Sequence, residues 1–170
     1  VETWVDPAQR INAPYVEFTR SAPAMADLNG DGLVELVMSG RVKQSEGVSG
    51  GQVVILNSAV MVYEPDGQRL RGWNVARLGD GPPLADVFGA SQAPALADLD
   101  GDGRVEIVVT LMDGTARAYR QSGELVWKYN FAQGMRLAAS EAVIGDIDGD
   151  RRLDIVFGTY SPDGSATNSV

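Results

Sequence analysis

The chain has 170 residues and a formal net charge of −9, from 23 Asp and Glu against 14 Lys and Arg. It contains no His and no Cys, which excludes Ser-His-Asp and Cys-His nucleophiles, disulfides, and metal sites held by those residues. The basic residues do not cluster, which argues against nucleic-acid binding. No apolar run approaches the roughly 20 residues of a membrane helix.

An internal repeat organises the chain. Three segments align without gaps, at residues 24–38, 95–109 and 143–157. Each reads as a short apolar strand, an acidic loop and a second apolar strand. Self-similarity of this kind is typical of repeat architectures, in which each unit packs only on its neighbours.

Residues 1–20 are interpreted as the last strand of a preceding unit, around Trp4, followed by a linker. Residues 21–90 form the first repeat. It contains a polar, Gly/Ser-rich insertion at 41–51, which we expect to be an exposed loop and a candidate partner contact. A smaller insertion lies at Asp80–Pro83.

Residues 91–140 form the second repeat. Strands are predicted over 105–111, 115–120 and 124–129, joined by glycine turns, and this pattern indicates an antiparallel meander. Residues 141–170 form a third repeat that stops before its last strand. We therefore expect the sequence to be a window on a longer array, cut at both ends.

Aromatic residues mark the units as well. Tyr63 and Tyr119 each lie four residues before a turn glycine, and Trp73 and Trp127 follow. A carbohydrate-stacking platform is one interpretation of these residues. Packing between units explains their recurrence better.

The acidic loops carry the chemistry. In each loop, side-chain oxygens at positions 1, 3 and 5, a backbone carbonyl at position 7 and an acid at position 9 form an all-oxygen shell. Such a shell suits Ca²⁺, which takes 6–8 oxygen ligands, better than Mg²⁺, which keeps several waters. The predicted ligands are Asp27, Asn29, Asp31, the carbonyl of Leu33 and Glu35 in the first loop; Asp98, Asp100, Asp102, the carbonyl of Arg104 and Glu106 in the second; and Asp146, Asp148, Asp150, the carbonyl of Arg152 and Asp154 in the third.

Two other interpretations of these loops fit the residues less well. An EF-hand needs Glu at position 12, where this chain has Met38, Val109 and Phe157. Solvated Asp/Gly turns explain a single loop more easily than three aligned copies. The third loop departs from the others because Arg151 replaces a glycine at position 6. If that position needs a positive φ, the third site is expected to be weaker.

These residues resemble the FG-GAP repeats of integrin α-subunits and the VCBS-type repeats of bacterial surface and secreted proteins. The Asp-x-Asp-x-Asp-Gly-x-x-Asp pattern of the family stands at 27–35, 98–106 and 146–154, with Glu at position 9 and Asn29 as departures. The resemblance implies a β-propeller, usually of seven four-stranded blades, with Ca²⁺ in hairpin loops.

The sequence therefore predicts an all-β fold of antiparallel four-stranded meanders, about two and a half blades of a larger propeller. Three structural Ca²⁺ ions are expected, in an extracellular, cell-surface or periplasmic protein. The expected role is binding, adhesion or assembly, with a protein or glycan ligand and with the rest of the propeller or another subunit. No catalysis is expected of this segment. The alternative is part of a propeller-fold polysaccharide lyase or hydrolase whose catalytic residues lie outside it.

Overall fold

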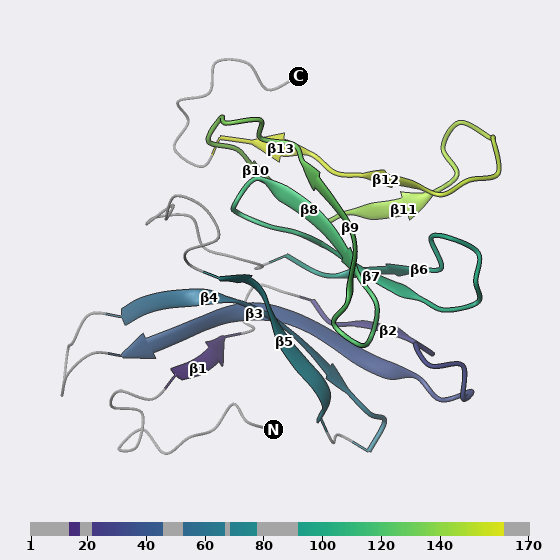
Figure 1. The fold of residues 1–170 in the computed structure, drawn as a ribbon, viewed down its shortest axis with the longest axis horizontal. Coiled ribbons are helices and arrows are strands. Elements are labelled where there is room, and N and C mark those ends of the chain that lie inside the picture. Colours follow the sequence, from purple (N-terminus) through teal and green to yellow (C-terminus); the bar gives the residue numbers. More distant parts are fainter. Residues whose placement is uncertain (1–13, 18–21, 46–52, 67–68, 78–91, 162–170) are drawn as a thin grey trace.

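A computed structural model describes residues 14–17, 22–45, 53–66, 69–77 and 92–161 (Figure 1). These residues form antiparallel strands and no helix, which confirms the predicted all-β class. Trp4 and the insertion at Asp80–Pro83 lie outside the described residues.

The first sheet contains a four-stranded meander with one added strand. Its members are β1 (Pro14–Glu17), β2 (Ala24–Ala26), β3 (Glu35–Ser45), β4 (Val53–Tyr63) and β5 (Arg69–Arg77). The beginning of β3 pairs with β2, its continuation over 41–44 pairs with β1, and β4 and β5 complete the order. The predicted loop over 41–51 is therefore wrong for residues 41–45, which continue β3. Backbone pairing with β1 and β4 holds this polar stretch extended.

The second sheet follows the prediction closely. It runs in the order β6 (Ala95–Ala97), β7 (Glu106–Thr110), β8 (Thr115–Tyr119) and β9 (Leu125–Asn130). The observed bounds of β7, β8 and β9 lie within one residue of the predicted ones at each end. β7 and β8 are buried along their whole length, which requires a packed layer on each face of the sheet.

The strands that follow the second sheet are short. They are β10 (Ala138–Ala139), β11 (Val143–Gly145), β12 (Asp154–Val156) and β13 (Thr159–Tyr160). β11 pairs with β12, and β10 pairs with β13.

Side-chain alternation along the central sheet builds a core on each side of it. Ile107 and Val109 of β7 pack with Val37 and Val60 of the first sheet. Val108, between them, packs with Ala142 and with residues of the third repeat. Each fully buried aliphatic side chain contributes about 1.5–3 kcal/mol to folding. Because successive side chains of β7 point to opposite faces of its sheet, this strand packs on both neighbouring units, and the three units form one stack.

The innermost strands β2, β6 and β11 lie next to one another in that order (Figure 1). This is the arrangement of consecutive propeller blades. Within the described residues the sheets form an open stack and not a closed ring. The blade number and the repeat boundaries stay predictions.

The tyrosines and tryptophans that recur in the first two repeats occupy only partly equivalent positions. Tyr63 and Tyr119 both lie directly after a register shift, in the third strand of their sheets, and Tyr119 is buried against the first sheet. Trp73 lies opposite Val60, three residues before Tyr63, whereas Trp127 lies opposite the residue just before Tyr119. Trp127 is also 37% exposed and stacks on Tyr129. Packing between units stays a prediction for Trp127.

Candidate metal centre

Each acidic loop connects the first two strands of its repeat. The loops join β2 to β3, β6 to β7 and β11 to β12, and Figure 1 shows all three at the same edge of the molecule. In every loop the ninth residue is the first residue of the second strand: Glu35, Glu106 and Asp154.

The first aspartate of each loop shapes the backbone around it. In the second loop, one Asp98 oxygen accepts the N–H of Gly101 at 2.7 Å, and the other accepts the N–H of Gly103 at 2.8 Å. Asp27 makes the same two contacts, at 2.7 and 2.8 Å, with the fourth and sixth loop residues. These side chain–backbone bonds fold each loop into the same tight turn.

The turn needs left-handed backbone at the sixth position. Gly32 and Gly103 have φ of 87° and 85°, and Arg151 of the third loop has φ of 70°. Arg151 therefore has the positive φ that the sequence alignment suggested for position 6. For a non-glycine residue this conformation costs about 1–2 kcal/mol. Arg151 nevertheless keeps the repeat's hydrogen bond, because its N–H donates to Asp146 at 2.9 Å.

The acid at position 9 closes each loop from the adjoining strand. One oxygen of Glu35 accepts the N–H of Leu28 at 2.7 Å, and one oxygen of Glu106 accepts the N–H of Leu99 at 2.9 Å. Both glutamates are completely buried. Their other oxygen, Oε1, is buried and accepts no hydrogen bond among the described residues. A buried carboxylate oxygen without a hydrogen bond carries a large desolvation cost that a bound cation would offset.

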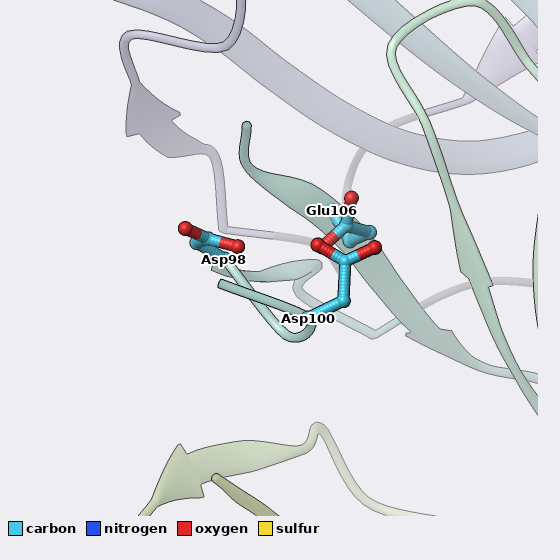
Figure 2. Close-up of side chains that lie close together, drawn as sticks. All are labelled: Asp98, Asp100 and Glu106. Atoms are coloured by element: carbon cyan, nitrogen blue, oxygen red, sulfur yellow. The ribbon is translucent and has the colours of Figure 1, made fainter. Parts of the chain in front are cut away.

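The structure brings together two groups of three acids, at positions 1, 3 and 9. They are Asp98, Asp100 and Glu106 (Figure 2), and Asp146, Asp148 and Asp154. In each group one oxygen per residue lies within 4.8 Å of the others. In the first loop, position 3 is Asn29, which offers an amide oxygen.

The predicted ligands at position 5 do not join the groups that positions 1, 3 and 9 form. The carboxylates of Asp102 and Asp150 are not members of these three-residue groups. Each accepts the N–H of the position-7 residue, Arg104 or Arg152, at 2.9 and 2.8 Å. Leu33 and Asp31 make the same contact in the first loop, at 2.8 Å. The position-7 carbonyls stay predicted ligands.

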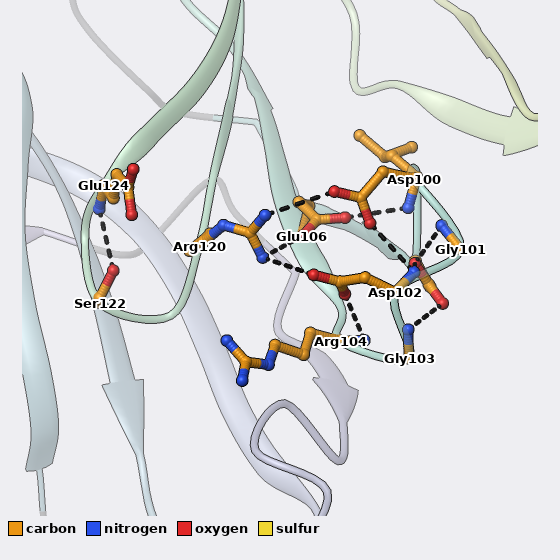
Figure 3. Close-up of polar contacts among 11 residues, drawn as sticks. Asp100, Gly101, Asp102, Gly103, Arg104, Glu106, Arg120, Ser122 and Glu124 are labelled. Atoms are coloured by element: carbon orange, nitrogen blue, oxygen red, sulfur yellow. Dashed lines mark hydrogen bonds and ion pairs between the residues drawn. The ribbon is translucent and has the colours of Figure 1, made fainter.

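A residue that the sequence did not single out lies beside the second loop. Arg120, directly after β8, contacts Asp102 at 3.0 Å, Asp100 at 3.3 Å and Oε1 of Glu106 at 3.5 Å (Figure 3). The hydrogen bond from Arg120 holds the pKa of Asp102 below its usual value. Burial raises the pKa of Glu106, and the amide of Leu99 opposes that rise. The signal that could have revealed Arg120 is its place after the marker tyrosine.

The chemistry of the predicted ligand atoms fits a hard cation. Every side-chain ligand predicted in the three loops offers a carboxylate or amide oxygen. Glu35 and Glu106 each have a buried Oε1 without a hydrogen-bond partner among the described residues. Oxygen ligands of this kind suit Ca²⁺, Mg²⁺ or Mn²⁺. The arrangement can therefore hold a divalent metal ion.

Residues 98–157 match the FG-GAP-like repeat family. The match begins at Asp98, the first residue of the second loop, and ends just after β12, so it spans the loops of the second and third repeats. The resemblance stated from the sequence is thereby confirmed.

A comparison with curated protein sequences gave no match. The part of the chain that the structure describes has no helix long and apolar enough to cross a membrane.

Proposed function

We propose that the chain is a calcium-binding β-propeller segment of an extracytoplasmic protein, and that it serves as a binding, adhesion or assembly module. The observation that carries the proposal is the pair of buried glutamates, Glu35 and Glu106, each of which ends an acidic loop and has a buried oxygen without a hydrogen-bond partner among the described residues. The repeated placement of these acids at one edge supports a structural role for the ions. Each ion would neutralise one loop and fix it to the adjoining strand.

The exposure of the loops supports an extracytoplasmic setting. Asp100, Asp146 and Asp148 are exposed to solvent, and open sites of this kind are typical of extracellular modules with dissociation constants of about 10⁻⁴–10⁻³ M. Such sites fill where calcium is at millimolar concentration. The exposed aromatic pair Trp127 and Tyr129 on the edge strand β9 supports a surface for a protein or glycan ligand. The proposal assigns no catalytic step to this segment.

Thermal unfolding in calcium and in chelator tests the proposal. A ligand that binds only the folded state at 100 times its dissociation constant adds about 2.7 kcal/mol of stability. For a chain of this size, each kcal/mol shifts Tm by about 2–4 °C. We therefore expect calcium to raise Tm by at least about 5 °C, and magnesium at the same concentration to raise it less.

A matched pair of variants locates the effect. Asp100→Asn removes a ligand charge but keeps the side-chain oxygen that accepts the Asp102 N–H. Glu141→Gln removes the same charge from an exposed position outside the loops. Asp100→Asn is expected to reduce the calcium-dependent rise in Tm, and Glu141→Gln to leave it unchanged. A Tm that is the same in calcium and in chelator would sink the structural-calcium proposal.

A further inference from the structure

The first two acidic loops have equivalent neighbours of opposite charge. Arg120 follows Tyr119 at the end of β8, and Glu64 follows Tyr63 at the end of β4. Tyr119 lies opposite Ile107, the second residue of β7, and Tyr63 lies opposite Leu36, the second residue of β3. Antiparallel pairing therefore carries the next residue of each strand toward the loop glutamate, Glu106 or Glu35.

The ion pair of Arg120 and the electrostatic surroundings of Glu64 agree with this register. Arg120 lies 3.5 Å from Oε1 of Glu106, the buried oxygen that accepts no hydrogen bond. Burial, followed by the negative charges of Glu35 and Asp31, raises the pKa of Glu64. One loop thus has a cation against its buried glutamate, and the other has a further anion.

These neighbours separate two loops that have the same formal charge. The first loop, 27–35, has three acids and no base, and the second, 98–106, has four acids and Arg104, so each has a formal charge of −3. Adding Glu64 to the first loop gives −4, and adding Arg120 to the second gives −2. The residue after the marker tyrosine therefore decides which loop is the more negative.

We propose that this position sets the calcium affinity of each loop: Arg120 is a built-in counter-ion that calcium must displace at the second loop, whereas Glu64 strengthens the first loop. The inference rests on the proposed calcium binding and extends it to the regulation of the individual sites. Arg120 contacts two of the three acids that lie within reach of a common ion, Asp100 and Glu106 (Figures 2 and 3). Calcium and the guanidinium compete for these same oxygens.

A calcium titration followed by amide NMR resolves the two loops. The N–H groups of Gly30 and Gly101 make equivalent hydrogen bonds to the first aspartate, each at 2.7 Å, so their signals report one loop each. In the unmodified chain we expect the Gly30 signal to reach its midpoint at lower calcium than the Gly101 signal.

Two substitutions then move the midpoints separately. Arg120→Met keeps the length of the side chain and removes its charge. It should lower the Gly101 midpoint about tenfold, which corresponds to about 1.4 kcal/mol, and leave the Gly30 midpoint unchanged. Glu64→Gln should raise the Gly30 midpoint by a similar factor. Arg120→Lys, which keeps the charge, should stay within about threefold of the unmodified chain.

Lys128→Met is the matched control for Arg120→Met, because it removes one positive charge from the exposed strand β9. In chelator, Arg120→Met should also lower Tm more than Lys128→Met does, since only the former leaves the second acidic cluster without its cation. This second measurement does not depend on bound metal.

The outcomes separate the two proposals. If both glycine signals respond to calcium but Arg120→Met does not shift the Gly101 midpoint more than Lys128→Met does, the counter-ion inference is wrong and calcium binding stands. If neither signal responds to calcium, the proposed function fails and the inference fails with it.

Discussion

Glu106→Gln is the substitution that best separates a metal ligand from a buried structural acid. Glutamine has the same shape, and its amide oxygen can keep the hydrogen bond from the Leu99 N–H, observed at 2.9 Å. The substitution removes only the charge of a side chain that is completely buried. Its effect on stability should therefore depend on whether calcium is present.

Without calcium the opposing contributions nearly cancel. A hydrogen bond to a charged group contributes about 1 kcal/mol more than a neutral one. The 3.5 Å contact with Arg120, which is partly exposed, contributes at most about 1 kcal/mol. Removing a buried charge releases a desolvation cost of similar or larger size. We expect the free energy of unfolding in chelator to stay within about 1 kcal/mol of the unmodified value.

With calcium the substitution should be clearly unfavourable. If the lost charge weakens binding 100-fold, calcium at 100 times the original dissociation constant stabilises the variant by only about 0.4 kcal/mol, against about 2.7 kcal/mol before. The difference of about 2.3 kcal/mol corresponds to roughly 5–9 °C in Tm. Differential scanning calorimetry in calcium and in chelator measures both values.

Glu124→Gln is the control, because Glu124 is exposed and lies outside the loop. It should change Tm little under either condition. If Glu106→Gln lowers Tm equally in calcium and in chelator, Glu106 is only a structural acid and the reasoning is refuted.

Two glycine pairs test the backbone of the second and third repeats by urea unfolding in chelator. Gly114 has φ of 80°, and a Cβ there would lie 2.3 Å from that of Ala132; Gly114→Ala should cost roughly 2–5 kcal/mol from strain and overpacking. Gly134→Ala, with φ of 90° and open space, should cost only about 1–2 kcal/mol, and equal losses would contradict the steric argument. Gly103→Ala, with φ of 85°, should cost a similar 1–2 kcal/mol. Gly145→Ala should cost less than about 0.5 kcal/mol, because the site is open, its φ is not positive and alanine stands there in the other repeats; a comparable loss would mean that the turn conformation is not the cause.

Local signals were sufficient to predict the second repeat. Its strands alternate, its turns contain glycine, and each pairs with a neighbour a few residues away, so the pattern and the register come from the same short stretch. The continuation of β3 over 41–45 could not be found in this way. This stretch pairs with β4 on one side and, over 41–44, with β1 on the other, and β1 lies more than 20 residues away in the sequence. Pairing with two strands overrides a polar composition that favours a loop.

The sequence predicted which residues offer oxygen ligands at the candidate site, but only part of their arrangement. Spacing alone identified the acids at positions 1, 3 and 9 that the structure groups in two loops. It could not reveal that one oxygen of the position-9 acid is used to bond the loop backbone. The spacing within the loop also did not reveal Arg120, because Arg120 lies outside the loop, directly after β8, and comes beside Glu106 through the pairing of β8 with β7.

The hydrogen bonds of the first aspartate hold the shape of each loop, whether or not the charge of the loop is neutralised. Asp27 accepts backbone N–H groups through both oxygens, at 2.7–3.1 Å, so the turn is held by the chain itself. A carboxylate oxygen has two lone pairs, and these bonds leave room for a cation. A cation is then needed to offset repulsion among the acids and the desolvation of Glu35, more than to form the turn. Arg120 lies against the buried Glu106, whereas the structure describes no basic side chain in an ion pair with Glu35 among the residues whose side chains it places. Loss of calcium should therefore destabilise the first loop, beside Glu64, more than the second, which keeps Arg120.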